Sequence, residues 1–310
     1  MNVLAFYMMV GLPGSGKSTK AEQIKNEFGA QVFSSDALRK EKFGDEKVQK
    51  DANGIFKELL NRCAASLDSG HTTILDATNL SYKKRMEFLR ELDKKVSLAF
   101  SKICVLMATP YEICCERNSS RERVVPDEAM KRMYCSFYTP AYFEGWDNIK
   151  IVYPDEMDRI EKLTDKYFAD IVDFPQDNPH HKYSLSEHLF EARKYIEEHY
   201  SYLPNKKFLY LKIAATYHDI GKPATKFFKP NDSVAHYYNH ENVGAYMILF
   251  IFRASSVESV LYISSLICYH MMPYVFEKSN ERTVERYKNL WGEEFYNDIM
   301  RLHEADVAVH

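Results

Sequence analysis

The first residues that could do chemistry form a glycine-rich segment near the start of the chain. Residues 11–18 read Gly-Leu-Pro-Gly-Ser-Gly-Lys-Ser, which fits the pattern G-x-x-x-x-G-K-S/T. In this pattern glycines let backbone N–H groups surround phosphate oxygens, the lysine reaches the β- and γ-phosphates, and the serine hydroxyl binds Mg²⁺. The spacing therefore predicts a site for ATP and Mg²⁺, built from Gly11, Gly14, Ser15, Gly16, Lys17, Ser18 and Thr19.

An acid and an arginine follow the next apolar run. Asp36 and Arg39 come directly after residues 30–33, so they should lie at the sheet edge where α/β proteins bind ligands. Asp36 could accept the proton of an acceptor hydroxyl, while Arg39 binds a nearby phosphate. The simpler alternative is that Asp36 caps the start of a helix, a position that Asp fills readily.

Three arginines lie within seven residues at positions 117, 121 and 123. Guanidinium groups bind phosphate oxygens bidentately and stabilise charge on a transferring phosphoryl group. The stretch could therefore be a lid over the phosphates, with Arg117 and Arg121 on the nucleotide. An ordinary solvated basic loop is the alternative.

The histidines are distributed unevenly. Only His71 precedes residue 180, and the other ten lie between His180 and His310. This asymmetry indicates a second chemistry in the second half of the chain. His180 and His181 fall in a proline-bracketed polar stretch, where adjacent side chains point apart, so we do not expect them to form a metal pair.

The elements that must position these residues alternate in the first half. Apolar runs at 3–10, 30–33, 72–79, 102–107 and 149–153 predict strands, and residues 20–28, 46–69, 82–95 and 157–172 predict helices. Alternation without hairpin signals predicts an α/β domain with a doubly wound parallel sheet. From residue 184 onward the pattern is helical without convincing alternating strands, which predicts an all-α domain.

Length and composition set the broad class. A chain of 310 residues is long for one core, so two domains are expected: residues 1–173 and 183–310, with a linker at 174–182. The net charge of −3 provides no global field for nonspecific binding to nucleic acid or membranes. Six cysteines without a C-x-x-C pair predict reduced thiols, and no apolar run is long enough to span a bilayer. We expect a cytoplasmic protein without a signal peptide.

Roughly the first 150 residues resemble phage-type 5′-polynucleotide kinases. The resemblance rests on residues 11–18, on Ser-Asp-Ala-Leu-Arg at 35–39, on Asp76-Ala-Thr-Asn79, and on the Arg117…Arg121…Pro126…Tyr134 series. It implies that Lys17 and Ser18 hold ATP and Mg²⁺, and that Asp36 is the general base for a 5′-hydroxyl. It also implies that Arg39 holds the acceptor's phosphate and Arg121 contacts the donor, while Asp76 and Asn79 shape the same site.

The last 125 or so residues resemble the HD phosphohydrolases. His-Asp-Ile-Gly-Lys-Pro at 218–223 is similar to the central signature of that family, within an H…HD…H…H…D series. The resemblance implies metal ligands at His188, His218, Asp219, His240, His270 and Asp306. Imidazole and carboxylate groups together suit Mn²⁺, Fe²⁺, Ni²⁺ or Zn²⁺ better than Mg²⁺, and a second metal is possible. Lys222 would neutralise a phosphate.

Together the two resemblances imply a bifunctional enzyme that heals RNA or DNA ends. The first domain would phosphorylate 5′-hydroxyl ends, and the second would remove a 2′,3′-cyclic, 2′ or 3′ phosphate, giving ends that a nucleic-acid ligase can seal. Two alternatives remain open. One is a kinase for a nucleoside or another small molecule fused to a nucleotide phosphohydrolase. The other is a non-catalytic sensor that binds nucleotide and metal.

Overall fold

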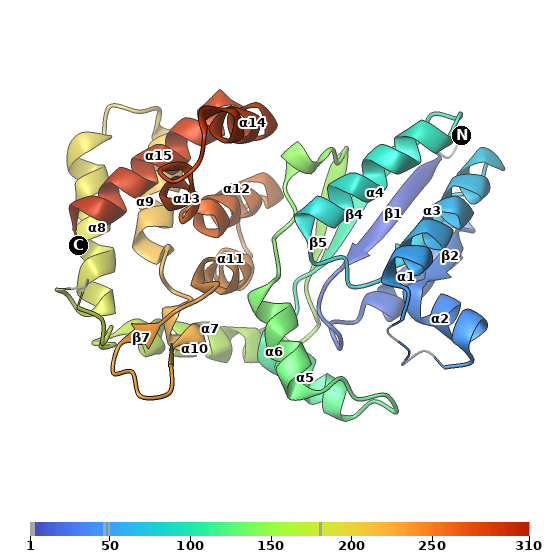
Figure 1. Ribbon diagram of the computed structural model, residues 1–310, viewed down its shortest axis with the longest axis horizontal. Helices are drawn as coiled ribbons and strands as arrows, with labels where there is room; N and C mark the ends of the chain where they lie inside the picture. Colours follow the sequence, from blue (N-terminus) through green and yellow to red (C-terminus); the bar gives the residue numbers. More distant parts are fainter. Residues whose placement is uncertain (1–3, 46–47, 49, 180–181, 310) are drawn as a thin grey trace. The chain divides into compact units, whose positions relative to one another are not determined.

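The computed structural model describes residues 4–45, 48, 50–179 and 182–309, which form two compact units. The first unit comprises Met1–Met133 and Pro140–Asp155, and the second comprises Tyr134–Thr139 and Glu156–His310 (Figure 1). This division groups residues 156–173 with the second unit, whereas the sequence suggested residues 1–173 as one domain. The domain bounds 1–173 and 183–310, with the linker at 174–182, stay a prediction. His180 and His181 lie outside the described residues.

The first unit is built on a parallel sheet of five strands in the order β2-β3-β1-β4-β5. The sequence prediction of a parallel α/β sheet is therefore confirmed. Its elements are β1 (Ala5–Val10), α1 (Lys17–Phe28), β2 (Gln31–Ser34), α2 (Ser35–Phe43), α3 (Ala52–Asp68), β3 (Thr73–Asp76), α4 (Tyr82–Lys95), β4 (Ser101–Met107), α5 (Tyr111–Ser119), α6 (Asp127–Cys135), the short 3₁₀ helix η1 (Tyr142–Glu144) and β5 (Asn148–Val152).

Strand β1 lies at the centre of the sheet and is buried along its whole length. Successive side chains of a strand point to opposite faces. On one face Tyr7 and Met9 join a core cluster that includes Ala21 and Ile24 of α1. On the other face Phe6 stacks on Phe88 of α4, with ring centroids 5.7 Å apart. Burial on both faces explains why β1 is an unbroken apolar run.

Two details of the first unit differ from the sequence prediction. The helix expected over residues 46–69 begins at Ala52, because Asp51 adopts a left-handed conformation (φ 53°) and its carboxylate accepts from the Gly54 N–H. Residues 46, 47 and 49 of that prediction lie outside the described residues. Residues 35–43 form a helix that the sequence analysis did not predict, α2, which ends at Gly44 with φ 74°.

A buried ion pair supports the turn that follows β3. Arg85 of α4 donates from Nε and Nη2 to both carboxylate oxygens of Glu144, at 2.7 and 2.6 Å. Its Nη1 donates to the carbonyls of Asn79 and Leu80, at 2.9 and 3.0 Å. The indole N–H of Trp146 also donates to Glu144. Hydrogen bonds thus reach both charged groups, which is what a fully buried ion pair requires.

The second unit is largely helical, as predicted, and includes α7 (Met157–Ile171), α8 (Leu185–His199), α9 (Asn205–Tyr217), α10 (Lys222–Thr225), α11 (His240–Ile251), α12 (Val257–Tyr269), α13 (Met272–Phe276), α14 (Glu281–Trp291) and α15 (Glu293–Ala308). The expectation that it contains helices alone is wrong in one place. Phe227–Phe228 (β6) and Ala235–His236 (β7) form an antiparallel hairpin. Two-residue strands are too short to leave an alternating pattern in the sequence.

None of the helices in the described parts of the chain is long and apolar enough to cross a membrane. All six cysteines are free thiols, in agreement with the sequence prediction. Four of them, including Cys114 beside the glycine-rich loop, are buried.

Candidate functional site

The glycine-rich loop connects the end of β1 to the start of α1. Gly14 and Gly16 adopt φ angles of 80° and 92°, which side chains rarely tolerate. A Cβ atom at Gly14 would also lie 2.4 Å from the Cys114 carbonyl oxygen. Helix α1 begins at Lys17, three residues earlier than predicted, so its N-terminal N–H groups face the loop. This arrangement binds phosphates through backbone donors and the helix dipole.

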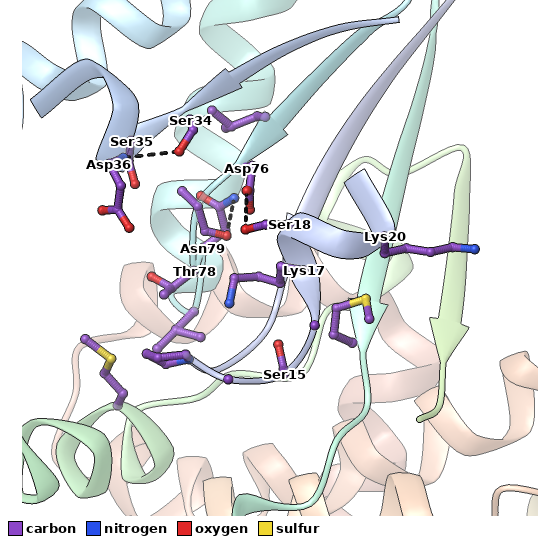
Figure 2. A pocket seen from close by; sticks show the side chains of 18 of the residues that line it. Ser15, Lys17, Ser18, Lys20, Ser34, Ser35, Asp36, Asp76, Thr78 and Asn79 are labelled. Carbon is purple, nitrogen blue, oxygen red and sulfur yellow. Dashed lines mark hydrogen bonds between the residues drawn. The ribbon is translucent and has the colours of Figure 1, made fainter. Parts of the chain in front are cut away.

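Lys17 is buried beneath the loop, and its ammonium donates to the Leu12 carbonyl at 2.7 Å (Figure 2). Burial lowers the pKa of Lys17 to about 8, against the opposing influence of Asp76. The hydroxyl of Ser15 is buried and has no hydrogen-bond partner among the described residues. A buried ammonium that donates to a neutral carbonyl and a buried hydroxyl without a partner fit an anionic ligand at this loop.

Ser18, the candidate magnesium ligand, lies in the first turn of α1 and faces Asp76 at the end of β3. Ser18 donates its hydroxyl proton to Asp76 at 2.7 Å, as the dashed line in Figure 2 marks. Asn79, with φ 50°, donates to the Met9 carbonyl at 2.8 Å and so fixes the turn after β3 against β1. A hydroxyl and a carboxylate side by side supply the oxygen ligands that Mg²⁺ prefers.

These side chains line one cavity of about 1520 Å³ within the first unit. It brings together nearly all the residues predicted to bind nucleotide or to act in phosphoryl transfer. They are Gly14, Ser15, Gly16, Lys17, Ser18, Thr19, Asp36, Arg39, Arg117 and Arg121, together with Asp76 and Asn79. Gly11 does not line the cavity, and its N–H donates to the Thr78 carbonyl beneath the loop. The volume exceeds the roughly 300–1,000 Å³ of a typical small-molecule site, which leaves room for two substrates.

Asp36 lies between two guanidinium groups. Its carboxylate oxygens are 3.3 Å from Arg39 and 3.1 Å from Arg123, an arginine of the predicted lid. The alternative in which Asp36 caps a helix is wrong. Ser34 caps α2, and its hydroxyl accepts from the N–H groups of Asp36 and Ala37. Asp36 lines the cavity together with both arginines.

The second candidate site gathers histidines and aspartates from separate elements of the second unit. His188 lies on α8, His218 and Asp219 follow the end of α9, and Asp306 lies on α15. These four form one buried group, with one ligand atom from each within 4.8 Å of the others. His240 begins α11, His270 follows α12, and with Asp219 they form a second such group.

Asp219 belongs to both groups. Its Oδ2 is 3.4 Å from the Nε2 atoms of His188 and His218, while its Oδ1 is 2.9 Å from Nε2 of His240 and 3.7 Å from that of His270. On the Oδ2 side, Oδ1 of Asp306 is 3.1 Å from His188. One carboxylate therefore faces two sets of donors, which is the arrangement of a ligand shared by two cations.

The imidazole tautomers fit metal binding. The Nδ1 atoms of His218, His240 and His270 face the carbonyls three residues earlier, at 2.9, 2.8 and 2.7 Å. A carbonyl can only accept, so each Nδ1 carries a proton, and in the neutral imidazole each Nε2 then presents a lone pair. The Nε2 atoms of His240 and His270 face each other at 3.2 Å. Two nitrogens bound to one ion at about 2.1 Å lie roughly this far apart.

The charges of the cluster are strongly coupled. Burial opposes the ionisation of Asp219, but Lys222 and the surrounding histidines hold its pKa well below the usual range. Burial opposes the charge of His188 too, yet hydrogen bonds to Asp219 and Asp306 raise the pKa of His188 to about 9. The carboxylates are thus ready to bind cations at neutral pH, and Lys222 lies 2.6 Å from Asp219.

Sequence reasoning missed three residues that help to position Lys222 and Asp306. The amide oxygen of Gln176 accepts from Lys222 at 2.7 Å, and the hydroxyl of Tyr237 donates to the Gln176 backbone carbonyl. The hydroxyl of Tyr274 donates to Asp306 at 3.0 Å. Gln176 lies in the segment predicted as a linker, and both tyrosines come from a stretch rich in tyrosine. No local pattern distinguished them from core or surface residues.

The N-terminal part of the chain matches a known family model. Residues 6–140 match the family model of an AAA domain. Together with the glycine-rich loop and the parallel sheet, this match supports a P-loop domain in the N-terminal part of the chain.

The curated relatives include two proteins of low identity. The L-seryl-tRNA(Sec) kinase of Methanococcus maripaludis is 25% identical over 151 residues, which are 45% of this chain and 55% of that protein. Protein kti12 of Schizosaccharomyces pombe is 23% identical over 154 residues, or 44% and 53%. The chain thus spans about half the length of these relatives. A chain in the structure of the Pnkp1/Rnl/Hen1 RNA repair complex has a TM-score of 0.37 and 22% identity, covering 44% of each chain.

Proposed function

We propose that the protein is a bifunctional enzyme that heals broken RNA ends. In this proposal the first unit transfers the γ-phosphate of ATP to a 5′-hydroxyl, and the second unit removes a 2′,3′-cyclic, 2′ or 3′ phosphate. The observation that carries the proposal is the presence of two phosphate-directed sites in one chain. One is a P-loop cavity with a candidate base, and the other is a buried His/Asp cluster with metal-ligand geometry.

For the transfer step, the acceptor hydroxyl oxygen attacks the γ-phosphorus of ATP, and the bond to the oxygen that bridges the β- and γ-phosphorus atoms breaks. ADP leaves, and the hydroxyl proton passes to Asp36. Lys17 and the loop N–H groups hold the phosphates of the donor, while Arg121 neutralises the charge that develops. Arg39 supports this scheme because its Nε is buried without a partner among the described residues, ready for a phosphate of the acceptor.

For the second unit, divalent ions would activate water and polarise the phosphate when bound. The residues of the chain would hold these ions and keep the side chains around them in a fixed orientation. Asp219 faces both donor groups, and the backbone carbonyls that accept from Nδ1 fix the orientation of His218, His240 and His270. Lys222 is the candidate cation for a phosphate oxygen, since its ammonium lies at the cluster.

The size of the P-loop cavity supports a polynucleotide acceptor over a nucleoside, since it can admit a donor and an extended acceptor together. One curated relative, named as a kinase of seryl-tRNA, acts by its name on an RNA-linked group. The proposed products, a 5′-phosphate and a free 3′ end, are the ends that a nucleic-acid ligase joins. A ligase is therefore the expected functional partner.

The decisive experiment uses one RNA oligonucleotide with a 5′-hydroxyl and a 2′,3′-cyclic phosphate, incubated with ATP, Mg²⁺ and either Mn²⁺ or Ni²⁺. We expect both ends to change. Lys17→Ala and Asp36→Ala should abolish only the 5′ event, and Asp219→Ala only the 3′ event. Matched controls are Lys25→Ala on the exposed side of α1 and Asp170→Ala on α7, which should change neither.

Each contrary outcome has a defined meaning. Loss of both events by one substitution would contradict two separate sites. Faster phosphorylation of a nucleoside than of the oligonucleotide would favour a small-molecule kinase. If the purified protein binds ATP and metal but turns over no phosphoryl group with any acceptor, the chain is a sensor and not an enzyme.

A further inference from the structure

An exposed aromatic surface lies on the β6–β7 hairpin of the second unit. We call it the hairpin face and define it as Phe227, Lys229, His236 and Tyr238. The hairpin pairs Phe227 with His236 in antiparallel register. Phe227 is 38% exposed and Tyr238 is 58% exposed, although both are large aromatic residues. Exposed aromatic rings beside a catalytic cluster call for a functional explanation.

The three rings of the hairpin face contact one another. The centroid of Phe227 is 5.4 Å from those of His236 and Tyr238, and His236 stacks on Tyr238 at 5.5 Å with an angle of 26°. The ammonium of Lys229 lies 6.0 Å from the Tyr238 ring centroid. The surface therefore presents a group of aromatic rings, with the Lys229 ammonium over the ring of Tyr238.

Stabilisation of the hairpin itself accounts for only part of this surface. The cross-strand pair of Phe227 and His236 supports a ladder that would be weak alone. Tyr238 lies beyond the ladder, and more than half of its surface is in solvent. Its contacts with Phe227 and His236 therefore leave most of its surface open to a ligand.

The hairpin face is attached directly to the His/Asp cluster. Tyr238 is two residues before His240, so their Cα atoms are at most about 7.6 Å apart. The residue before Tyr238 contacts the cluster: the Tyr237 carbonyl lies 2.8 Å from Nδ1 of His240, and the Tyr237 hydroxyl donates to Gln176, which also accepts from Lys222. The upper limit of about 7.6 Å between the Cα atoms of Tyr238 and His240 corresponds to about two stacked nucleotides at about 3.4 Å each.

We propose that the hairpin face stacks on a nucleobase of the strand whose phosphate the His/Asp cluster removes. This inference rests on the function proposed above for the second unit and specifies its substrate as single-stranded nucleic acid with unpaired bases at the processed end. Aromatic rings stack on any base, and the flexible Lys229 side chain beside them would meet a backbone phosphate. A protein partner would need a larger apolar area than these rings expose.

The test compares two RNAs with the full-length protein. Both are eight-nucleotide single strands with a 5′-phosphate and a 2′,3′-cyclic phosphate, and in one of them the last two nucleotides lack bases. Tyr238→Ala should raise KM for the complete RNA about 10-fold and leave KM for the abasic RNA unchanged. Tyr238→Phe keeps the ring and should behave as the wild type. Phe190→Ala, which removes another aromatic side chain that is 60% exposed, is the matched control.

Equal KM changes for both RNAs, or no change for either, would overturn the inference while leaving the phosphohydrolase proposal intact. If the wild type releases no phosphate from either RNA, the proposed activity of the second unit fails. Equilibrium binding of the same RNAs, followed by fluorescence anisotropy, then decides the inference alone. A preference for the complete RNA that disappears in Tyr238→Ala supports it, and equal binding of both RNAs contradicts it.

Discussion

The two candidate sites are assembled in opposite ways. The P-loop is one contiguous segment, and its ligand-binding groups are mainly backbone N–H groups that glycines at φ 80° and 92° expose. The His/Asp cluster takes side chains from five separate parts of the chain, and all of its proposed ligands are buried. The first site depends on local backbone conformation. The second depends on the packing of the helices that carry it.

This difference determines how each site should respond to change. A substitution in the glycine-rich loop should change only the backbone conformation and hydrogen bonds of that loop. A substitution in the helical unit can displace ligands that lie far away in the sequence, because α8, α9, α11, α12 and α15 must all keep their positions. The following predictions test this contrast, from the largest effect to the smallest.

The largest effect should come from Asp219, the one ligand that faces both donor groups. Asp219→Asn should remove bound metal from both groups and lower the phosphohydrolase rate by more than about 100-fold. This loss exceeds the roughly 10- to 100-fold loss expected for a residue that only hydrogen-bonds to a metal ligand. Metal content by mass spectrometry and phosphate release measure the two effects. ATP-dependent 5′ phosphorylation should stay at the wild-type rate, and its loss would contradict the separation of the sites.

Gly221 tests the dependence of the cluster on helix packing. A Cβ atom there would lie 2.1 Å from the His240 carbonyl oxygen, which is rigid backbone at the start of α11. Gly221→Ala should therefore lower the free energy of unfolding by about 1–3 kcal/mol, measured by denaturant titration. Metal affinity should fall as well, because His240 is displaced. Gly70→Asn is the control, since that position has φ 79° and open space around it.

The pKa of Lys17, about 8, predicts a pH dependence confined to the P-loop site. The protonated ammonium binds phosphate, and a lowered pKa means that the free site loses this charge as pH rises through 8. The Kd for ATP should therefore increase up to about tenfold per pH unit above 8. Calorimetry between pH 7 and 10 would measure it. Lys17→Arg keeps its charge over this range, so its Kd should be higher but flat.

The smallest effect should come from Tyr274, which contacts a proposed ligand. Tyr274→Phe removes only the hydroxyl that donates to Asp306 at 3.0 Å. We expect metal affinity to fall about 10-fold, the lower end for a partner of a ligand, without a change in the free energy of unfolding beyond about 1 kcal/mol. Tyr262→Phe, which removes a hydroxyl from the buried Asp298 elsewhere in the unit, should leave metal affinity unchanged.

Much of the first unit could be predicted because its signals are local. The glycine spacing, the apolar run of β1 and the polar ends of β2 and β3 each occupy a few consecutive residues. The start of α3 was missed because a single left-handed residue, Asp51, sets it. Helix α2, which carries Asp36 and Arg39, was missed because its cap, Ser34, is also the last residue of β2.

In the second unit the structure brings the predicted ligands together, and their role as ligands stays a prediction, whereas the contacts that hold them could not be predicted. His218 and Asp219 were found through a resemblance, and the structure brings them together with His188 and Asp306. Gln176 was assigned to a linker because prolines flank it, yet its amide holds Lys222. The hydrogen bond between Gln176 and Lys222 joins residues 46 positions apart. Such contacts depend on tertiary packing, which a single sequence does not reveal.

The buried pair of Arg85 and Glu144 has a consequence for behaviour on heating. Arg85 holds the carbonyls of Asn79 and Leu80 from inside the core, so the turn that borders the P-loop cavity is fastened to the interior of the first unit. A turn held in this way cannot loosen while the core is intact. Loss of nucleotide binding on warming should therefore coincide with the melting of the first unit rather than precede it.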